Sequence, residues 1–182
     1  QITLGNGNDT YTSTSTAGED VTATAGNNTI STGAGDDAIT LGTGNDNVSG
    51  EAGADTFTVA TARFTTDDTI AGGAGTDSIT LSDGATVVDA DFTNVTTTET
   101  LTATGGASSV TTGALSAAAG ITTVVASTGN DTITIGASSS STLGVTATTG
   151  GTTGGNDKID ASGYSGALTV TFADTADLTA AD

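Results

Sequence analysis

The feature that most constrains this chain is an acidic residue that recurs every nine positions. Three segments, residues 33–39, 42–48 and 51–57, align without gaps. Each carries an Asp (37, 46 and 55) that is followed two places later by an apolar residue. A fixed period of this kind is typical of a repeat architecture in which one small structural unit stacks on the next.

The same register extends in both directions along the chain. It continues backwards through two further units to a one-residue insertion, and forwards past four extra residues around 60–64. Almost every unit keeps an acid or Asn, followed two places later by Tyr, Val, Ile or Phe. The register positions are Asp9, Glu19, Asn28, Asp37, Asp46, Asp55, Asp68 and Asp77. High net charge and few aromatic residues are otherwise the signature of a disordered chain, but this strict placement of acids indicates a folded one.

The repeat predicts an all-β fold, a right-handed parallel β-roll in which two nonapeptides make one full circuit. Glycines before each acid allow the backbone angles that a tight turn needs. The three residues after the acid form a short strand whose middle, apolar side chain points inward. Residues 18 apart then stack on the same edge. One edge should stack Asp37, Asp55 and Asp77, and the other Asn28, Asp46 and Asp68.

Stacked carboxylates predict bound calcium. At a strand spacing of ~4.8 Å they repel one another unless a cation lies between them, and the chain has 21 acidic against two basic residues. Carboxylates and turn carbonyls are ligands that Ca²⁺ prefers, and the narrow core makes several such ions part of the fold. The alternative is that these acids are solvated turn residues. The predicted metal-site residues are Asp9, Glu19, Asn28, Gly33, Gly35, Asp37, Gly42, Gly44, Asp46, Gly53, Asp55, Asp68, Gly73, Gly75, Asp77, Asp131 and Asp157.

The second half differs in composition, which divides the chain into a calcium-binding roll over residues 1–81 and a Thr-rich parallel solenoid over 82–182. Of the 21 acids, 14 lie in residues 1–91. We expect wider, irregular turns here, with stacked Thr columns in place of ions. Residues 114–120 could form a helical turn, and two isolated echoes of the repeat surround Asp131 and Asp157. Strands are expected at 85–88, 99–104, 109–112, 121–126, 132–135, 143–149 and 167–172.

Composition excludes several classes of function. Without His or Cys there is no Ser-His-Asp or Cys-His nucleophile and no zinc site of the usual ligands. Two basic side chains cannot neutralise nucleic-acid phosphates or an anionic membrane, and no apolar run is long enough to enter a bilayer. The acid pairs 36/37, 67/68 and 89/91 could act as acid and base, but turn carboxylates explain them more simply. We therefore expect that the chain has no enzymatic activity.

Residues 72–80, GGAGTDSIT, match G-G-x-G-x-D-x-U-x in full, the pattern of the RTX (hemolysin-type) calcium-binding nonapeptide repeats. The flanking DFTNV at 91–95 and ETLTATG at 99–105 resemble the Thr-rich solenoid of RTX-type bacterial surface-layer (S-layer) proteins. This resemblance implies an extracellular structural protein, exported by type I secretion and folded by calcium at the cell surface.

The partners implied by this resemblance are copies of the chain itself, in a lattice or a filament, and cell-surface polysaccharide. The alternatives left open are the stalk or carrier region of a large secreted adhesin, toxin or hydrolase, and the subunit of an extracellular filament. A chain that needs calcium to fold should stay unfolded in the calcium-poor cell interior, which suits secretion before folding. Gln1 in place of an initiator Met is expected of a processed product or an excerpt of a longer chain.

Overall fold

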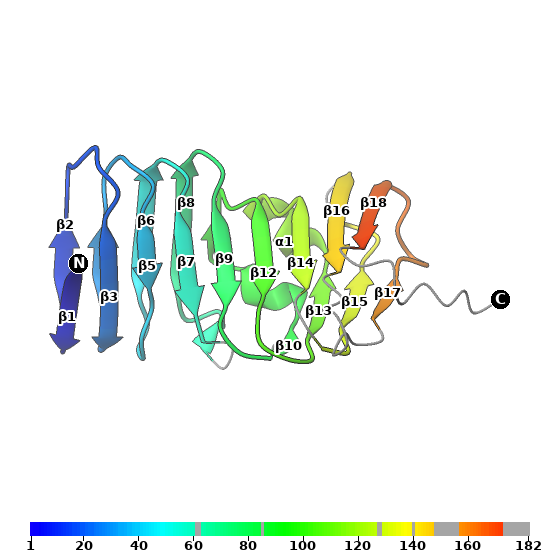
Figure 1. Ribbon diagram of the computed structural model, residues 1–182, viewed down its shortest axis with the longest axis horizontal. Helices are drawn as coiled ribbons and strands as arrows, with labels where there is room; N and C mark the ends of the chain where they lie inside the picture. Colours follow the sequence, from blue (N-terminus) through cyan, green and yellow to red (C-terminus); the bar gives the residue numbers. More distant parts are fainter. Residues whose placement is uncertain (61–62, 85, 127–128, 140, 148–156, 173–182) are drawn as a thin grey trace.

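The chain forms a parallel β-solenoid in which strands from successive circuits stack in chain order along the long axis (Figure 1). In this computed structural model the structure describes residues 1–60, 63–84, 86–126, 129–139, 141–147 and 157–172. We call one full circuit of the chain a coil. All pairings between the named strands are parallel, so the predicted all-β parallel fold is confirmed.

Three sheets form the walls of the solenoid. A nine-stranded sheet runs the length of the molecule and consists of β1 (Ile2–Asn6), β3 (Asp20–Ala25), β5 (Ala38–Thr40), β7 (Thr56–Val59), β9 (Ser78–Leu81), β12 (Thr100–Ala103), β14 (Thr123–Ala126), β16 (Thr142–Ala147) and β18 (Ala167–Phe172). In the first half it faces a five-stranded sheet of β2 (Thr10–Thr12), β4 (Thr29–Ser31), β6 (Asn47–Ala52), β8 (Thr69–Ala74) and β11 (Val95–Thr96). In the second half a four-stranded sheet takes its place, with β10 (Thr86–Val87), β13 (Ser109–Thr112), β15 (Thr132–Ile135) and β17 (Lys158–Asp160).

The coils that include or follow residue 60 are longer than those before it. Ala38 pairs with Thr56, 18 residues on, whereas Thr56 pairs with Ser78 and Thr100 with Thr123. The first step in length is the predicted insertion after residue 60. The nine-stranded sheet runs without a break past residue 81, so the two predicted segments share one wall.

The core is a narrow stack of apolar side chains, one or two from each strand. The residue two places after each acid points inward, as predicted: Ile39, Val48, Phe57, Ile70 and Ile79 are all buried. In the second half Leu101, Val110, Val124 and Ile133 continue these columns. Such a thin core offers little hydrophobic stabilisation per coil, which leaves the turns to supply the rest.

Two short helices fill the wider coils of the second half. The 3₁₀ helix η2 (Asp89–Phe92) buries Phe92 against Phe64 of the insertion, with ring centroids 5.3 Å apart and an interplanar angle of 74°. The α-helix α1 (Ala114–Ala119) lies within the stretch expected to form a helical turn and buries Ala119. Among the residues that the structure describes, no helix is long and apolar enough to cross a membrane.

The strands expected in the second half are present, with bounds within two residues where the structure describes them. The predicted strand at 143–149 corresponds to β16, and its last two residues lie outside the described part of the chain. Thr columns also form, on the outer face of the nine-stranded sheet. They begin in the first half, where Thr40 pairs with Thr58 and Thr58 with Thr80, and so are not confined to the region expected to lack ions.

Candidate calcium-binding turns

The acids of the repeat lie in two rows, one on each edge where the chain passes between the nine-stranded and five-stranded sheets. The first ladder comprises Asp9, Asn28, Asp46 and Asp68, which precede β2, β4, β6 and β8. The second ladder comprises Glu19, Asp37, Asp55, Asp77 and Glu99, which precede β3, β5, β7, β9 and β12. The predicted stacking on each edge is therefore observed, with Asp9, Glu19 and Glu99 as additional members.

Within each ladder, the backbone N–H of one residue donates a hydrogen bond to the side chain of the ladder residue one coil further along. The backbone N–H of Asp37 donates to Oδ1 of Asp55 at 2.9 Å, and that of Asp55 to Oδ1 of Asp77 at 2.8 Å. In the first ladder the N–H of Asp46 donates to Oδ1 of Asp68 at 2.8 Å. From the second member of each ladder onward, one side-chain oxygen thus ties its coil to the preceding one.

The second carboxylate oxygen has no such partner. The Oδ2 atoms of five ladder residues are buried and accept no hydrogen bond, namely those of Asp9, Asp37, Asp46, Asp55 and Asp77. The last four of these residues are at most 2% exposed. A buried polar atom without a partner costs about 1–3 kcal/mol, and more when it carries charge. These oxygens therefore require a cation or a proton.

Glycines pack directly against two of these free oxygens. A Cβ atom added at Gly50 would overlap Oδ2 of Asp55, and one added at Gly72 would overlap Oδ2 of Asp77. Gly53 and Gly75 have φ of 143° and 151°, and a Cβ at either would overlap a carbonyl oxygen of the preceding coil. Only glycine fits turns that are both left-handed and this closely stacked.

Burial of these carboxyl groups raises their pKa values. Desolvation, with smaller contributions from neighbouring ladder acids, raises the pKa of Asp55 to about 6. Burial likewise raises the pKa of Asp77, with Glu99 adding to the effect. The pKa of Asp68 is also raised by burial, and the charge of Arg63 opposes the shift. The calcium-free ladders therefore resist full ionisation, which is the state that a bound cation would favour.

The donor set fits calcium. Within the described ranges no three His, Cys, Asp or Glu side chains come together as a metal site. A cation in these turns must therefore take most of its ligands from backbone carbonyls, with carboxylate oxygens supplying the charge. Calcium accepts six to eight such oxygens in flexible geometry. The free Oδ2 atoms beside glycine turns provide the side-chain part of this set.

A third, shorter ladder lies in the second half. The N–H of Ser108 donates to Oδ1 of Asp131 at 2.6 Å, and the N–H of Asp131 to Oδ1 of Asp157 at 2.9 Å. The Oδ2 atoms of both aspartates are buried without a partner. The two isolated echoes of the repeat are thus brought together, and their carboxylates repeat the arrangement of the first half. Burial also raises the pKa of Asp131.

The glycines predicted to line the metal sites lie in the turns of the two ladders. Gly42 and Gly44 precede Asp46 on the first edge. The glycines of the second edge are Gly33, Gly35, Gly53, Gly73 and Gly75. Whether their carbonyls ligate calcium stays a prediction.

Some ladder members were not identified from the sequence. Glu99 accepts the N–H of Asp77 through Oε2 at 2.8 Å, although no glycine precedes it in its turn. Its spacing of 22 residues from Asp77 equals that between Asp55 and Asp77, and this spacing was the available signal. Ser108 begins the third ladder with no acid at all.

In each acid pair considered for acid–base chemistry, at least one carboxylate accepts a backbone hydrogen bond. Asp36 accepts the N–H of Ala54 at 2.8 Å, one coil further along. Asp89 accepts the N–H groups of Ser116 at 2.8 Å and Leu115 at 3.0 Å, at the start of α1. These bonds lower the pKa of Asp89 despite its partial burial. Asp91 accepts the N–H of Val88 at 2.9 Å.

Comparison with known families gives one match. The model of the RTX calcium-binding nonapeptide repeat, in four copies, matches residues 17–57, 64–91 and 116–134. The chain carries RTX calcium-binding nonapeptide repeats. RTX nonapeptide repeats bind calcium, several ions in a repeat region. That the free Oδ2 atoms are among the calcium ligands stays a prediction. No curated protein and no solved structure matches the chain.

The RTX match covers most of the first two ladders and reaches into the second half. Its last segment includes Asp131 but ends before Asp157. RTX repeats form a structural β-roll and are typical of extracellular proteins secreted by the type I route. The predicted family and its calcium cofactor are therefore confirmed.

Proposed function

We propose that this chain is a calcium-stabilised structural segment of a bacterial surface layer, where copies of it associate side by side. The observation that carries the proposal is the row of buried, unpartnered Oδ2 atoms. They make calcium a condition of the fold, so the chain would become rigid only outside the cell. Asp36, Asp89 and Asp91, which were considered as catalytic acids or bases, accept hydrogen bonds from backbone N–H groups. These bonds support a structural rather than an enzymatic role.

One face of the solenoid supports association between copies. Chains with a net charge of −19 repel one another, and the acids concentrate in the turns. The outer positions of β5, β7, β9, β12 and β14 carry no charged residue. Thr40, Thr58, Thr80 and Thr102 form one column there by their pairing. A second copy could approach this uncharged face without placing like charges together.

The shape of the solenoid also supports a second candidate, the stalk of a larger type I-secreted protein. A rod of stacked coils can act as a spacer beside an adhesive or enzymatic domain. A stalk needs calcium for folding but has no need to associate through the Thr face. Self-association therefore separates the two proposals.

The experiment compares single substitutions on two walls of the same region. Thr102→Asp places a charge on the outer face of β12, and Thr111→Asp places the same charge on β13 of the four-stranded sheet. Negative-stain imaging and light scattering in calcium follow assembly. A surface-layer protein should form sheets that Thr102→Asp abolishes and Thr111→Asp preserves. A wild-type chain that stays a folded monomer in calcium would favour the stalk.

A further inference from the structure

Asn28 differs from the aspartates of its ladder in having all its polar atoms satisfied. It is 1% exposed and occupies the position that Asp46 and Asp68 hold in later coils. Its Oδ1 accepts the N–H of Asp9 at 3.0 Å, just as Oδ1 of Asp46 and Oδ1 of Asp68 each accept the N–H of the ladder residue one coil earlier. Its second polar atom is an amide nitrogen, where the aspartates carry the free Oδ2.

The amide of Asn28 joins two oxygens that would otherwise face each other. Nδ2 donates to the carbonyl oxygen of Gly26 in its own turn at 3.1 Å, and to Oδ1 of Asp46 in the next coil at 2.9 Å. A cation between coils would contact the same two kinds of oxygen, a turn carbonyl and a carboxylate. The Nδ2 protons therefore supply the positive charge density that a metal supplies elsewhere.

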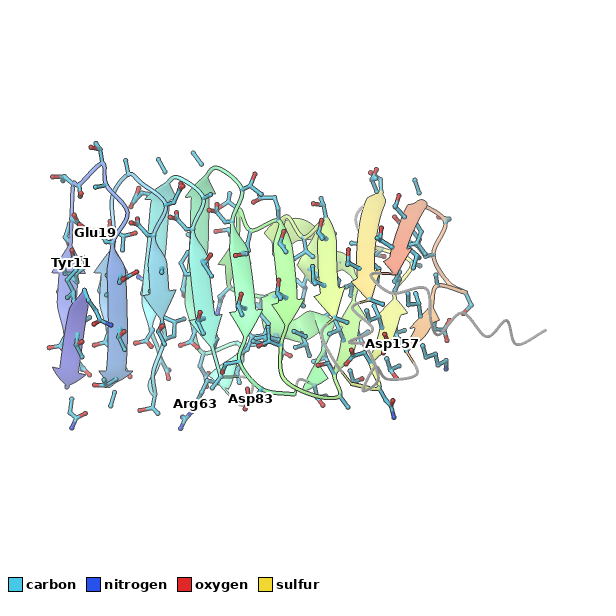
Figure 2. The ribbon with its side chains drawn as sticks, viewed as in Figure 1. Tyr11, Glu19, Arg63, Asp83 and Asp157 are labelled. Atoms are coloured by element: carbon cyan, nitrogen blue, oxygen red, sulfur yellow. The ribbon has the colours of Figure 1, made fainter. Side chains whose placement is uncertain are left out.

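The neighbouring turn on the other edge is also satisfied by side chains. Oε1 of Glu19 accepts the hydroxyl of Ser13 at 2.8 Å, and Oε2 accepts the hydroxyl of Tyr11 at 2.8 Å. Figure 2 shows Tyr11 and Glu19 beside one another near the first strands. Glu19 and Asn28 lie nine residues apart, so together they belong to one coil.

We propose that this coil, around β3 and β4, is held by side-chain hydrogen bonds in place of calcium, and that Asn28 excludes the ion from its turn. The inference rests on calcium binding by the other turns, as in the proposed function. It replaces the prediction that Asn28 and Glu19 ligate calcium. The first ladder is then divided, with the free Oδ2 of Asp9 on one side of Asn28 and that of Asp46 on the other.

The test exchanges the amide for a carboxylate. Asn28→Asp restores the ladder aspartate, removes the Nδ2 donor and should add one bound calcium per chain. The matched control is Asn27→Asp, which adds the same charge at an exposed neighbour whose Oδ1 accepts the N–H of Asn45 at 3.0 Å. The full chain is dialysed against calcium, and bound metal is counted by elemental analysis. Circular dichroism in saturating calcium verifies the fold.

The reverse exchange keeps the inference testable if Asn28→Asp fails to fold. Asp46→Asn should lose one calcium and remain folded, because the new amide can bridge its own turn to Asp68. An unchanged count in folded Asn28→Asp, or an equal gain in Asn27→Asp, would overturn the inference. So would a fully retained count in Asp46→Asn. A wild-type chain that binds no calcium would instead contradict the proposed function.

Discussion

The backbone N–H of Asp55 donates a 2.8 Å hydrogen bond to Oδ1 of Asp77, one coil further along, while Oδ2 of Asp77 is buried with no partner. This relationship repeats along both edges of the roll. It uses half of each carboxylate to set the register between coils and leaves the other half for a cation.

Loss of a ladder carboxylate should weaken calcium binding. Asp46→Ala removes one free Oδ2 and the acceptor of the Asn28 N–H, so we expect affinity to fall at least about tenfold, since a hydrogen bond to a charged group is worth roughly 1.5–3 kcal/mol. Asp83→Ala removes an exposed acid outside the ladders and should have little effect. Calorimetric titration with calcium measures both variants. Equal losses of calcium affinity in the two variants would contradict the assignment of Asp46 to a calcium-binding ladder.

Asp89 should matter to stability but not to calcium. Its carboxylate accepts two N–H groups at the start of α1 from a different coil. Asp89→Ala should therefore lower the free energy of unfolding by about 0.5–2 kcal/mol, the usual range for a lost helix cap. Denaturant unfolding in saturating calcium measures the loss, and the number of bound ions should not change. A reduced ion count would mean that Asp89 is also a ligand.

The stacked turn glycines should not tolerate a side chain. Gly53 has φ of 143° and lies against the carbonyl of Gly35, so Gly53→Ala should destabilise the roll by at least about 1–3 kcal/mol. Gly5 has open space around it, and Gly5→Ala serves as the control. Thermal unfolding in calcium compares the two variants. Similar melting temperatures would show that the turns are looser than this geometry requires.

Acid should partly replace calcium. In the calcium-free roll burial raises the pKa of Asp55 to about 6, whereas its ordinary value is 3.8. Between these values the folded chain holds more protons than the unfolded one, so stability rises as pH falls and is lost as pH rises through about 6. Far-ultraviolet circular dichroism in calcium-free buffer tests this, because more strand signal should remain at pH 5 than at pH 7. Asp55→Asn should reduce the difference, and a roll less stable at pH 5 would contradict it.

The ladders could be predicted from the sequence because the nine-residue period determines which residues stack on one another. A step of nine with one inward residue per strand is enough to stack Asp37 on Asp55, and counting the insertion brings Asp77 into line. Glu99 was not identified as a ladder residue because its turn lacks the glycines that mark the others. The only sequence signal that related Glu99 to Asp77 was their spacing, which equals that between Asp55 and Asp77.

The hydrogen-bond partners within the turns could not be read from the sequence. Asn28 and Asp46 occupy equivalent repeat positions, and only the contacts of Nδ2 with Gly26 and Asp46 distinguish them. Asp89 likewise looked like one member of an acid pair with Asp91. Its true partners lie in α1, 26 and 27 residues further along, where the coil has widened beyond the regular period.

The most direct test is a calcium titration of the full chain followed by far-ultraviolet circular dichroism. With free calcium removed by a chelator at neutral pH, the strand signal should collapse, because the buried Oδ2 atoms of Asp37, Asp46, Asp55 and Asp77 would be charged and unpaired. Returning calcium should restore the signal cooperatively. A strand spectrum that is the same with and without calcium would contradict a roll held together by the ion.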